Sequence, residues 1–426
     1  MATSPTNSRI RSSHGEPPPS LNQELIVDEI LTRLPVAAVV RCRSVCRAWN
    51  AALASDHFVA AHAARAAAAR HPEIVFFSPT ERGVATSFYA CSLPVDGDAP
   101  PAEARKLLRV GNLAGEHLLL SGNKPCNGLT LLFDVRLAEY HLFNLSTGQH
   151  IALPPCETAE EITPLVPKPM RLKRFPMELS STGLGFDPAT GQHKVVRLFR
   201  NIFGQQKCES CADDGSARDR EHDAPILSLS VGAERFGWVS TPPKLASRIR
   251  HLTNLDGSLC AVVHDGLIID NVLLLMTWSR SSPSWSARCQ VDMGSLPRPI
   301  RDELRGRNIV PLCSMGGAEK ILLATSRHKV YIYDTESGDV EEVFDMNAFV
   351  DIPCSNSEAQ LFVNIGLHEE RIAGVGRTLA GDKRLQVKRG GDTVVGKREV
   401  SPEVYQRYRD KDEHFRSMRG MIMQFA

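Results

Sequence analysis

The hydrophobic positions of residues 21–62 recur at helical spacing and form two short groups. The first group runs to Leu34 and predicts a helix that Pro35 ends, because proline lacks a backbone N–H and disfavours a helical residue before it. A helical unit of this size buries only about 60% of its unfolded surface, so part of its apolar surface is expected to be left for a partner protein. The two groups are Leu25, Ile26, Ile30, Leu31 and Leu34, then Val36, Val39, Val40, Val45, Cys46, Trp49 and Leu53.

Farther along, the pattern changes from helix to strand. From Arg47 to Arg70 the chain is rich in alanine, which favours a helix that ends at His71-Pro72. Short β-prone runs separated by Gly, Pro, Asp and Asn follow, as is typical of antiparallel strands joined by turns. The pattern therefore predicts an α+β multidomain chain, with a helical domain followed by a mostly antiparallel all-β domain. The expected strands include Ile74–Phe77, Thr130–Phe133, Lys194–Phe199, Leu227–Val231, Leu259–Val263, Ile321–Thr325 and Lys329–Tyr333.

A pentapeptide of the form [Asn/Asp]-x-x-[Ser/Thr]-Gly occurs three times, at Asn144–Gly148, Asp187–Gly191 and Asp334–Gly338. Its first side chain can cap a turn, and its glycine can take the positive φ that reverses a strand. The second copy starts 43 residues after the first and the third 147 after the second, which is three steps of 49. A period of about 40–50 residues indicates propeller blades, roughly six or seven of them over residues 73–375. The alternative is three unrelated hairpin turns, since such pentapeptides are common.

The order L-x-x-E-L-I-x-D-E-I-L-x-R-L-P-V, then R-C-R-S-V-C-R-A-W, then S-D-x-F and a His resembles the F-box over residues 21–62. One departure is Asn22, where the family usually has proline, although Ser20 and Gln23 still fit a capping box. The resemblance implies a trihelical module that docks on a Skp-type adaptor and joins the chain to a cullin–RING ubiquitin ligase. The alternative is that the same leucines are ordinary core of a helical domain. The resemblance places on the adaptor face Leu25, Ile26, Ile30, Leu34, Pro35, Val36, Val40, Val45, Cys46 and Trp49; some of these must hold the module together, Trp49 above all.

A second resemblance follows the first along the chain. The segments Cys126–Leu129 and Gly183–Pro188, with others between and after them, resemble in order the plant F-box-associated domain, a β-propeller substrate receptor. Leu145 departs from the Asn-Pro of its first signature. The resemblance implies that the propeller binds a protein substrate through its loops, without saying which substrate or which loops. The other matching positions are Tyr140, Asn144, Thr147-Gly148, Leu153-Pro154, Lys194–Val196, Asp256–Cys260, Trp278, Trp285 and Lys320–Leu323.

Composition and charge indicate the compartment in which the protein is expected to act. The net charge of +1 gives no general attraction to nucleic acid or to a membrane surface, and no apolar run approaches the roughly 20 residues of a spanning helix. Eleven cysteines without a dense framework suit reduced thiols, which predicts a cytoplasmic and/or nuclear protein. The expected domains are a disordered leader (1–19), the F-box helical domain (20–70), the F-box-associated β-propeller-like domain (73–375) and a charged, flexible tail (376–426).

Candidate chemistry is sparse. Cys208, Cys211 and His222 are spaced like zinc ligands, but a structural site needs four, so we expect reduced cysteines of a surface loop over residues 200–225 and no metal or cofactor. No nucleophile elbow, metalloprotease helix or P-loop occurs, so no catalytic residue is predicted. The basic tail lacks aromatic residues interleaved with its arginines, so nucleic-acid binding is not expected. The predicted function is a non-catalytic substrate-recognition subunit of a Skp–cullin–F-box (SCF) ubiquitin ligase. The alternatives are a propeller scaffold that acts without the ligase and a glycan-binding receptor.

Overall fold

The chain divides into two compact units, Met1–Ala69 and Arg70–Ala426. We call residues 25–68 the helical unit and the described residues from 73 onward the β unit. The expected leader, Asn22 and most of the expected tail lie outside the described residues. The computed structural model describes residues 25–68, 73–80, 84–93, 103–134, 137, 139–153, 180–200, 206–209, 226–246, 248–265, 272–305, 308–350, 363–372, 385–390 and 394–395.

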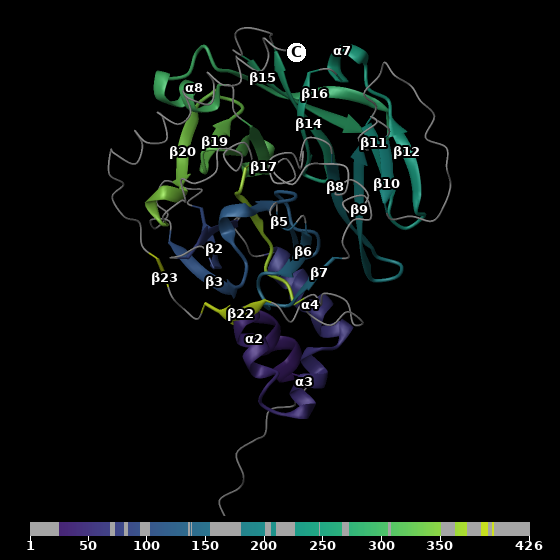
Figure 1. Ribbon diagram of the computed structural model, residues 1–426, viewed down its shortest axis with the longest axis vertical. Helices are drawn as coiled ribbons and strands as arrows, with labels where there is room; N and C mark the ends of the chain where they lie inside the picture. The colour runs from purple at the N-terminus through teal and green to yellow at the C-terminus, as the bar shows by residue number, and fades with distance from the viewer. Residues whose placement is uncertain are drawn as a thin grey trace, which may run out of the picture. The chain divides into compact units, whose positions relative to one another are not determined.

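The helical unit, which Figure 1 shows, begins with a first helix that is irregularly wound. A π-helical turn, η1 (Ile26–Ile30), runs into a 3-10 turn, η2 (Leu31–Arg33), and the chain is extended at Leu34 and Pro35. The alanine-rich segment predicted as one helix is broken at Ser55, whose hydroxyl accepts the N–H of Phe58 (3.2 Å) and so caps the last helix. The α-helices are α2 (Val36–Cys42), α3 (Arg47–Leu53) and α4 (Asp56–Ala68).

All paired strands of the β unit are antiparallel, and the described residues form six sheets (Figure 1). Each strand expected from the sequence lies in one of them, which confirms the predicted all-β domain. Three sheets are four-stranded: β4 (Leu118–Leu120), β5 (Leu129–Asp134), β6 (Glu139–Asn144) and β7 (His150–Ala152); β13 (Ile249–Leu255), β14 (Ser258–Asp265), β15 (Val272–Ser279) and β16 (Ser284–Asp292); and β17 (Ile309–Met315), β18 (Lys320–Thr325), β19 (Lys329–Asp334) and β20 (Val340–Asp345).

The remaining sheets differ in size. The largest has six strands, β1 (Glu73–Pro79), β2 (Ala85–Ser92), β3 (Ala104–Gly111), β21 (Gly366–His368), β22 (Gln386–Arg389) and β23 (Val394–Val395). One has three, β8 (Ser180–Asp187), β9 (Gln192–Arg200) and β10 (Gln206–Glu209), and one has two, β11 (Ile226–Ser230) and β12 (Arg235–Val239). The short helices are η3 (Gly115–His117), α7 (Pro243–Ala246), α8 (Arg298–Leu304), η5 (Gly316–Ala318) and η6 (Met346–Ala348).

Shared cores join neighbouring sheets into a ring. One cluster of buried side chains joins the β1 sheet to the β17–β20 sheet, a second joins β13–β16 to β17–β20, and a third joins the β1 sheet to β4–β7. A fourth cluster, within β4–β7, packs against Leu184 of β8 and Val195 of β9. The two-stranded sheet completes the ring, because Val231 lies against Gly185 on one side and Ser240 accepts the Trp285 N–H (3.1 Å) on the other.

Four of the six sheets have at least four strands among the described residues, so counting these as blades gives a four-blade propeller-like fold. The spacing of the pentapeptides had predicted six or seven blades, more than the four that the described residues form. The reason is that β8–β10 and β11–β12 form sheets of only three and two strands within the described residues.

The three pentapeptides form the same turn. In each, the backbone N–H of the final glycine donates to the carbonyl of the first residue, at 2.8 Å for Asn144 and Asp187 and 3.0 Å for Asp334. The side-chain oxygen of the first residue also accepts backbone N–H groups inside the turn, which is the predicted cap. The glycines that close the turns have φ of +77°, +67° and +78°, at Gly148, Gly191 and Gly338.

The six-stranded sheet that contains β1 is completed by strands from the C-terminal part of the chain. Strand β21 pairs with β1, and β22 and β23 pair with β3, so residues from both ends of the β unit share one sheet. Asn123 holds the segment that leads into β21, since its amide nitrogen donates to the carbonyls of Val363 and Ile365, both at 2.7 Å. Residues 386–389 and 394–395 were expected in a flexible tail, and the structure instead makes them strands. Their pairing partner, β3, lies about 280 residues earlier, so no local pattern marks it.

Candidate protein-docking site

The helical unit is held together by a small apolar core. Val36, Val39, Leu53 and Phe58 have no exposed surface, and Leu31 is buried beside them in the same unit. Leu31 comes from η2, Val36 and Val39 come from α2, Leu53 comes from α3, and Phe58 comes from α4. This core fixes the short helices, which are individually too short to be stable in water.

Polar contacts fix the break between the first helix and α2. The His62 ring on α4 donates its Nε2–H to the carbonyl of Leu34 (2.9 Å), directly before Pro35. The carboxylate of Glu29 pairs with Arg65 of α4 (3.0 Å) and with Arg33 (3.4 Å), and the Arg65 hydrogen bond and charge, followed by Arg33, lower the pKa of Glu29. The first helix is therefore tied to α4 at both a buried and an exposed point.

Apolar side chains remain uncovered on this unit. Leu25, Ile30 and Val45 are 50%, 44% and 65% exposed, although each is large and hydrophobic. Pro35 and Cys46 are also exposed, and Ile26, Leu34, Val40 and Trp49 are half-buried. The Cys46 Sγ accepts the Trp49 backbone N–H (3.4 Å), so this part of the predicted motif is a cap for α3. Large apolar side chains left in water are typical of a surface that another protein covers.

The structure separates one predicted adaptor-face residue from the others. Val36 has no exposed surface and belongs to the core described above. Trp49, which the sequence singled out as structural, keeps part of its surface exposed. Sequence reasoning did not name Phe58 and His62 as the residues that support the face. Their signal was the S-D-x-F segment and the following His, which the resemblance used only as a marker.

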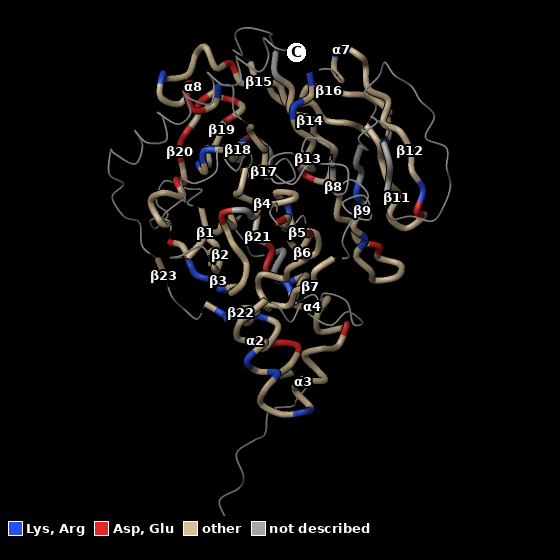
Figure 2. The backbone as a smooth tube through the Cα atoms, viewed as in Figure 1, with Lys and Arg blue, Asp and Glu red and all other residues tan. Residues whose placement is uncertain are grey.

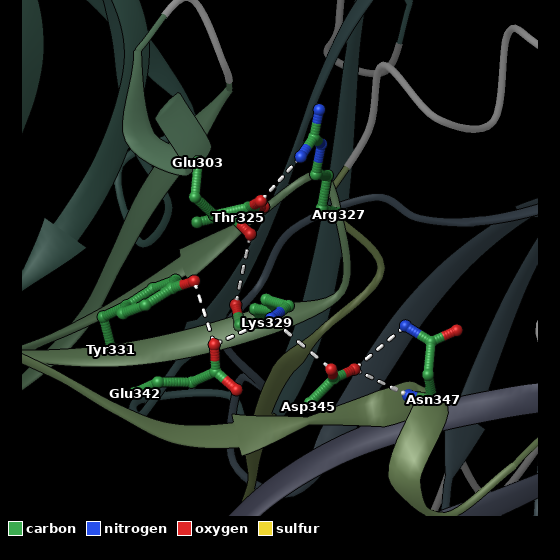
Figure 3. A network of polar contacts seen from close by, with 8 residues as sticks. All are labelled: Glu303, Thr325, Arg327, Lys329, Tyr331, Glu342, Asp345 and Asn347. Atoms are coloured by element: carbon green, nitrogen blue, oxygen red, sulfur yellow. Dashed lines mark hydrogen bonds and ion pairs between the residues drawn. The ribbon is translucent and has the colours of Figure 1, made fainter. Parts of the chain in front are cut away.

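A largely buried ionic network in the β unit is a second candidate site (Figure 3). Glu303 on α8 pairs with Arg327 (2.9 Å), and Lys329 pairs with Glu342 (2.7 Å) and Asp345 (3.5 Å). Burial alone would lower the pKa of Lys329, but the hydrogen bond with Glu342 and the charge of Asp345 outweigh it and raise that pKa. Both cations thus have carboxylate partners, and the network is best explained as a support for the β17–β20 sheet.

The part of the chain that the structure describes holds neither a cluster of metal-binding side chains nor a membrane-spanning helix. There, no group of three or more His, Cys, Asp and Glu side chains is placed to hold a metal ion. Cys208 lies on β10, a strand inside the segment predicted as a loop, while Cys211 and His222 lie outside the described residues. Of the described helices, none has the length and apolar content that crossing a membrane requires. Figure 2 shows basic and acidic residues interleaved along the described chain.

Comparison with known proteins identifies the helical unit. Residues 21–60 match the F-box domain family. The chain carries an F-box domain. That match includes η1, η2, α2 and α3 and the beginning of α4, and so includes the whole exposed apolar set, Leu25, Ile30 and Val45.

Two relatives carry the same domain name. The Arabidopsis thaliana "Putative F-box protein At1g33530" is 25% identical over 179 residues, which is 41% of this chain and 33% of the relative. The Arabidopsis thaliana "Putative F-box protein At1g47790" is 28% identical over 190 residues, 44% of this chain and 41% of the relative. The alignments thus span less than half the length of these curated relatives.

Among solved structures, the β-propeller domain of Cps50 (Swd1) from Myceliophteria thermophila is similar over 65% of this chain and 87% of its own, with a TM-score of 0.32 and 8% identity. A TM-score this low carries no argument. The assignment of the β unit therefore depends on its sheets, their order and their shared cores.

Proposed function

We propose that the chain is the substrate-recognition subunit of a Skp–cullin–F-box ubiquitin ligase. The observation that carries the proposal is the set of exposed apolar side chains, Leu25, Ile30 and Val45, within the segment that matches the F-box domain. Covering apolar surface stabilises a complex by about 25 cal/mol per Å², so a Skp-type adaptor that covers this set gains binding free energy. The proposed adaptor face comprises Leu25, Ile26, Ile30, Leu34, Pro35, Val40, Val45, Cys46 and Trp49, while Val36 holds the unit together.

In this proposal the chain performs no chemistry of its own. Ubiquitin transfer belongs to the RING and conjugating-enzyme partners, and this chain raises the rate by holding a protein substrate near them. The β unit supplies the substrate surface, since its sheets form a rigid frame that presents turns and loops. The proposed compartment is the cytoplasm, the nucleus or both, where such ligases act.

The test is capture of the full chain by a purified plant Skp-type adaptor. Ile30→Asp places a carboxylate in the proposed interface, where losing its hydration without a partner costs about 3 kcal/mol, or roughly 100-fold in affinity. Ile30 is 44% exposed, so the variant should remain folded by circular dichroism. Val84→Asp is the matched control, because Val84 is 60% exposed and lies in the β unit.

Capture of wild type and Val84→Asp, with loss for Ile30→Asp, supports the proposed face. Capture of all three would show that the adaptor uses a different surface. Failure of folded wild-type protein to bind any adaptor tested would refute the ligase assignment and favour a scaffold that acts alone.

A further inference from the structure

A hollow of about 690 Å³ lies at one end of the β13–β16 sheet. It is built around two hairpins, β13–β14 and β15–β16, whose strand ends and turns supply all of the described residues that line it. Its volume falls within the ~300–1,000 Å³ typical of ligand pockets. The lining residues are Leu252, Thr253, Asn254, Gly257, Ser258, Leu259, Thr277, Trp278, Ser279, Arg280 and Ser281.

The side chain of Trp278, which is fixed by its neighbours, forms one wall of the hollow. Trp278 is paired across the strands with Leu259 on β14 and Trp285 on β16, so the three side chains share one face of the sheet. The Trp285 indole is itself fixed, because its Nε1–H donates to the carbonyl of Ser240 (3.1 Å). The Trp278 and Trp285 rings lie 5.6 Å apart and support each other. Trp278 therefore offers a rigid apolar surface that costs little entropy to use in binding.

Among the described residues that line the hollow, the charge has one sign. Arg280 is the charged residue among them, and none of them is a carboxylate. Asp256 lies in the β13–β14 turn, but its Oδ1 accepts the backbone N–H of Ser314 on the next sheet (3.2 Å). Arg250 is exposed two positions before Leu252, in the row of alternating exposed residues that continues to Asn254. Neither arginine has an ion pair with any residue that the structure describes.

Hydrogen-bonding groups complete the lining. Five hydroxyl side chains surround Trp278 and Arg280, and those of Ser279 and Ser281 lie 3.0 Å apart. Hydroxyls can donate to a carbonyl or carboxylate and can accept a peptide N–H, which suits an extended peptide backbone. Tryptophan and arginine are also the side chains that most often dominate binding free energy at protein interfaces.

We propose that this hollow binds an acidic segment of a protein substrate. A carboxylate of the segment lies on the Arg280 guanidinium, and a neighbouring part of the segment packs on the Trp278 ring. This inference rests on the proposed function, because it names the substrate class that the β unit holds. A phosphorylated segment is the competing ligand, but phosphate is usually held by a cluster of arginines, and the described lining of this hollow holds a single arginine.

The test uses direct binding to the purified full chain. The probe is a fluorescein-labelled peptide of about ten residues that alternates Glu and Ser, beside an otherwise identical peptide with Gln for Glu, at low ionic strength where such contacts are least screened. Fluorescence anisotropy should show about tenfold tighter binding of the Glu peptide, and Arg280→Gln should remove most of that difference. Binding should also change the tryptophan emission, and this change should be lost in Trp278→Phe.

The matched control is Arg298→Gln. Arg298 lies on α8 outside the hollow with its side chain 84% exposed, and its substitution lowers the net charge by the same amount. Equal weakening by Arg280→Gln and Arg298→Gln would mean a general charge effect and would overturn the proposal. Binding of a phosphoserine version alone would also overturn it, in favour of a phosphate site.

The same variants separate this inference from the proposed function. Arg280→Gln should still be captured by the Skp-type adaptor, because the exposed apolar set of the F-box domain is unchanged. Loss of peptide binding with retained adaptor capture places the defect in the hollow. Adaptor capture by wild type that binds no peptide at all would refute the inference and leave the ligase assignment standing.

Discussion

Replacing Arg327 by methionine tests the buried ionic network of the β unit. Arg327 Nη1 lies 2.9 Å from Glu303 Oε2, and the Glu303 side chain is only 7% exposed. The other carboxylate oxygen, Oε1, is buried and has no hydrogen-bond partner among the described residues. The variant would therefore leave the Glu303 carboxylate buried without the Arg327 guanidinium that pairs with it.

The structure sets the size of the expected loss. Two unit charges about 4 Å apart attract by about 4 kcal/mol at the effective dielectric constant of ~20 that suits protein sites. Removing one partner of a buried pair costs about 3–5 kcal/mol, and the Arg327 side chain is 30% exposed, so we expect the lower end, about 3 kcal/mol. Replacing both partners should cost much less, because no uncompensated charge remains buried.

The assay is urea unfolding of Arg327→Met, Glu303→Met and the double variant. Tryptophan emission reports on the region, because Trp278 and Trp285 lie in the β13–β16 sheet, which shares a core with β17–β20. We expect the double variant to be more stable than Arg327→Met, with a coupling free energy of about 2 kcal/mol or more. A loss below about 1 kcal/mol for Arg327→Met, or strictly additive losses, would refute the claim that this pair is buried and coupled.

Two further predictions concern the β unit. Asn123→Ala removes both side-chain hydrogen bonds to the Val363 and Ile365 carbonyls, so we expect a loss of about 2–3 kcal/mol and faster amide exchange in β21, while β13–β16 keep their protection. For His328, burial lowers the pKa to about 4, with the Asp345 charge acting in the opposite direction, so its contribution to stability is complete above the unfolded pKa of about 6.5 and is lost as the pH falls toward 4. His328→Asn tolerates the φ of +65° at this position and should flatten the loss of stability in that pH window; an unchanged profile in thermal unfolding would show that His328 does not titrate there.

The local features of this fold were readable from the sequence because each one is decided within a few residues. The three pentapeptide turns depend on one side chain and one glycine, and the structure confirms them at Asn144, Asp187 and Asp334. The break of the alanine-rich segment was also local but was missed, because helix propensity was summed across Ser55. A serine followed by Asp56 was the available signal, since both residues favour a helix start.

The features that sequence reasoning missed depend on pairs of distant residues. Nothing near Gln386 indicates that β22 will pair with β3, because its pairing groups are ordinary backbone atoms. The hollow was missed for the same reason, since Leu252 on β13 and Trp278 on β15 come together only after three strands have aligned. Within the F-box match, burial alone separates Val36 from its exposed neighbours, and one apolar residue in a helix resembles another until the core is assembled.

The six-stranded sheet joins strands from both ends of the β unit, and this has a consequence for synthesis on the ribosome. Strand β1 ends at Pro79, whereas its partner β21 begins at Gly366, so one edge of β1 stays unpaired until nearly the whole β unit has been translated. At about 5–20 residues per second this wait lasts on the order of 15–60 s. During that time the buried side chains of Ile74, Val75 and Phe76 lie on an open strand edge, which is a template for aggregation. A nascent chain that stops before residue 366 can never pair this edge of β1, so chaperones and quality control would treat it as unfinished.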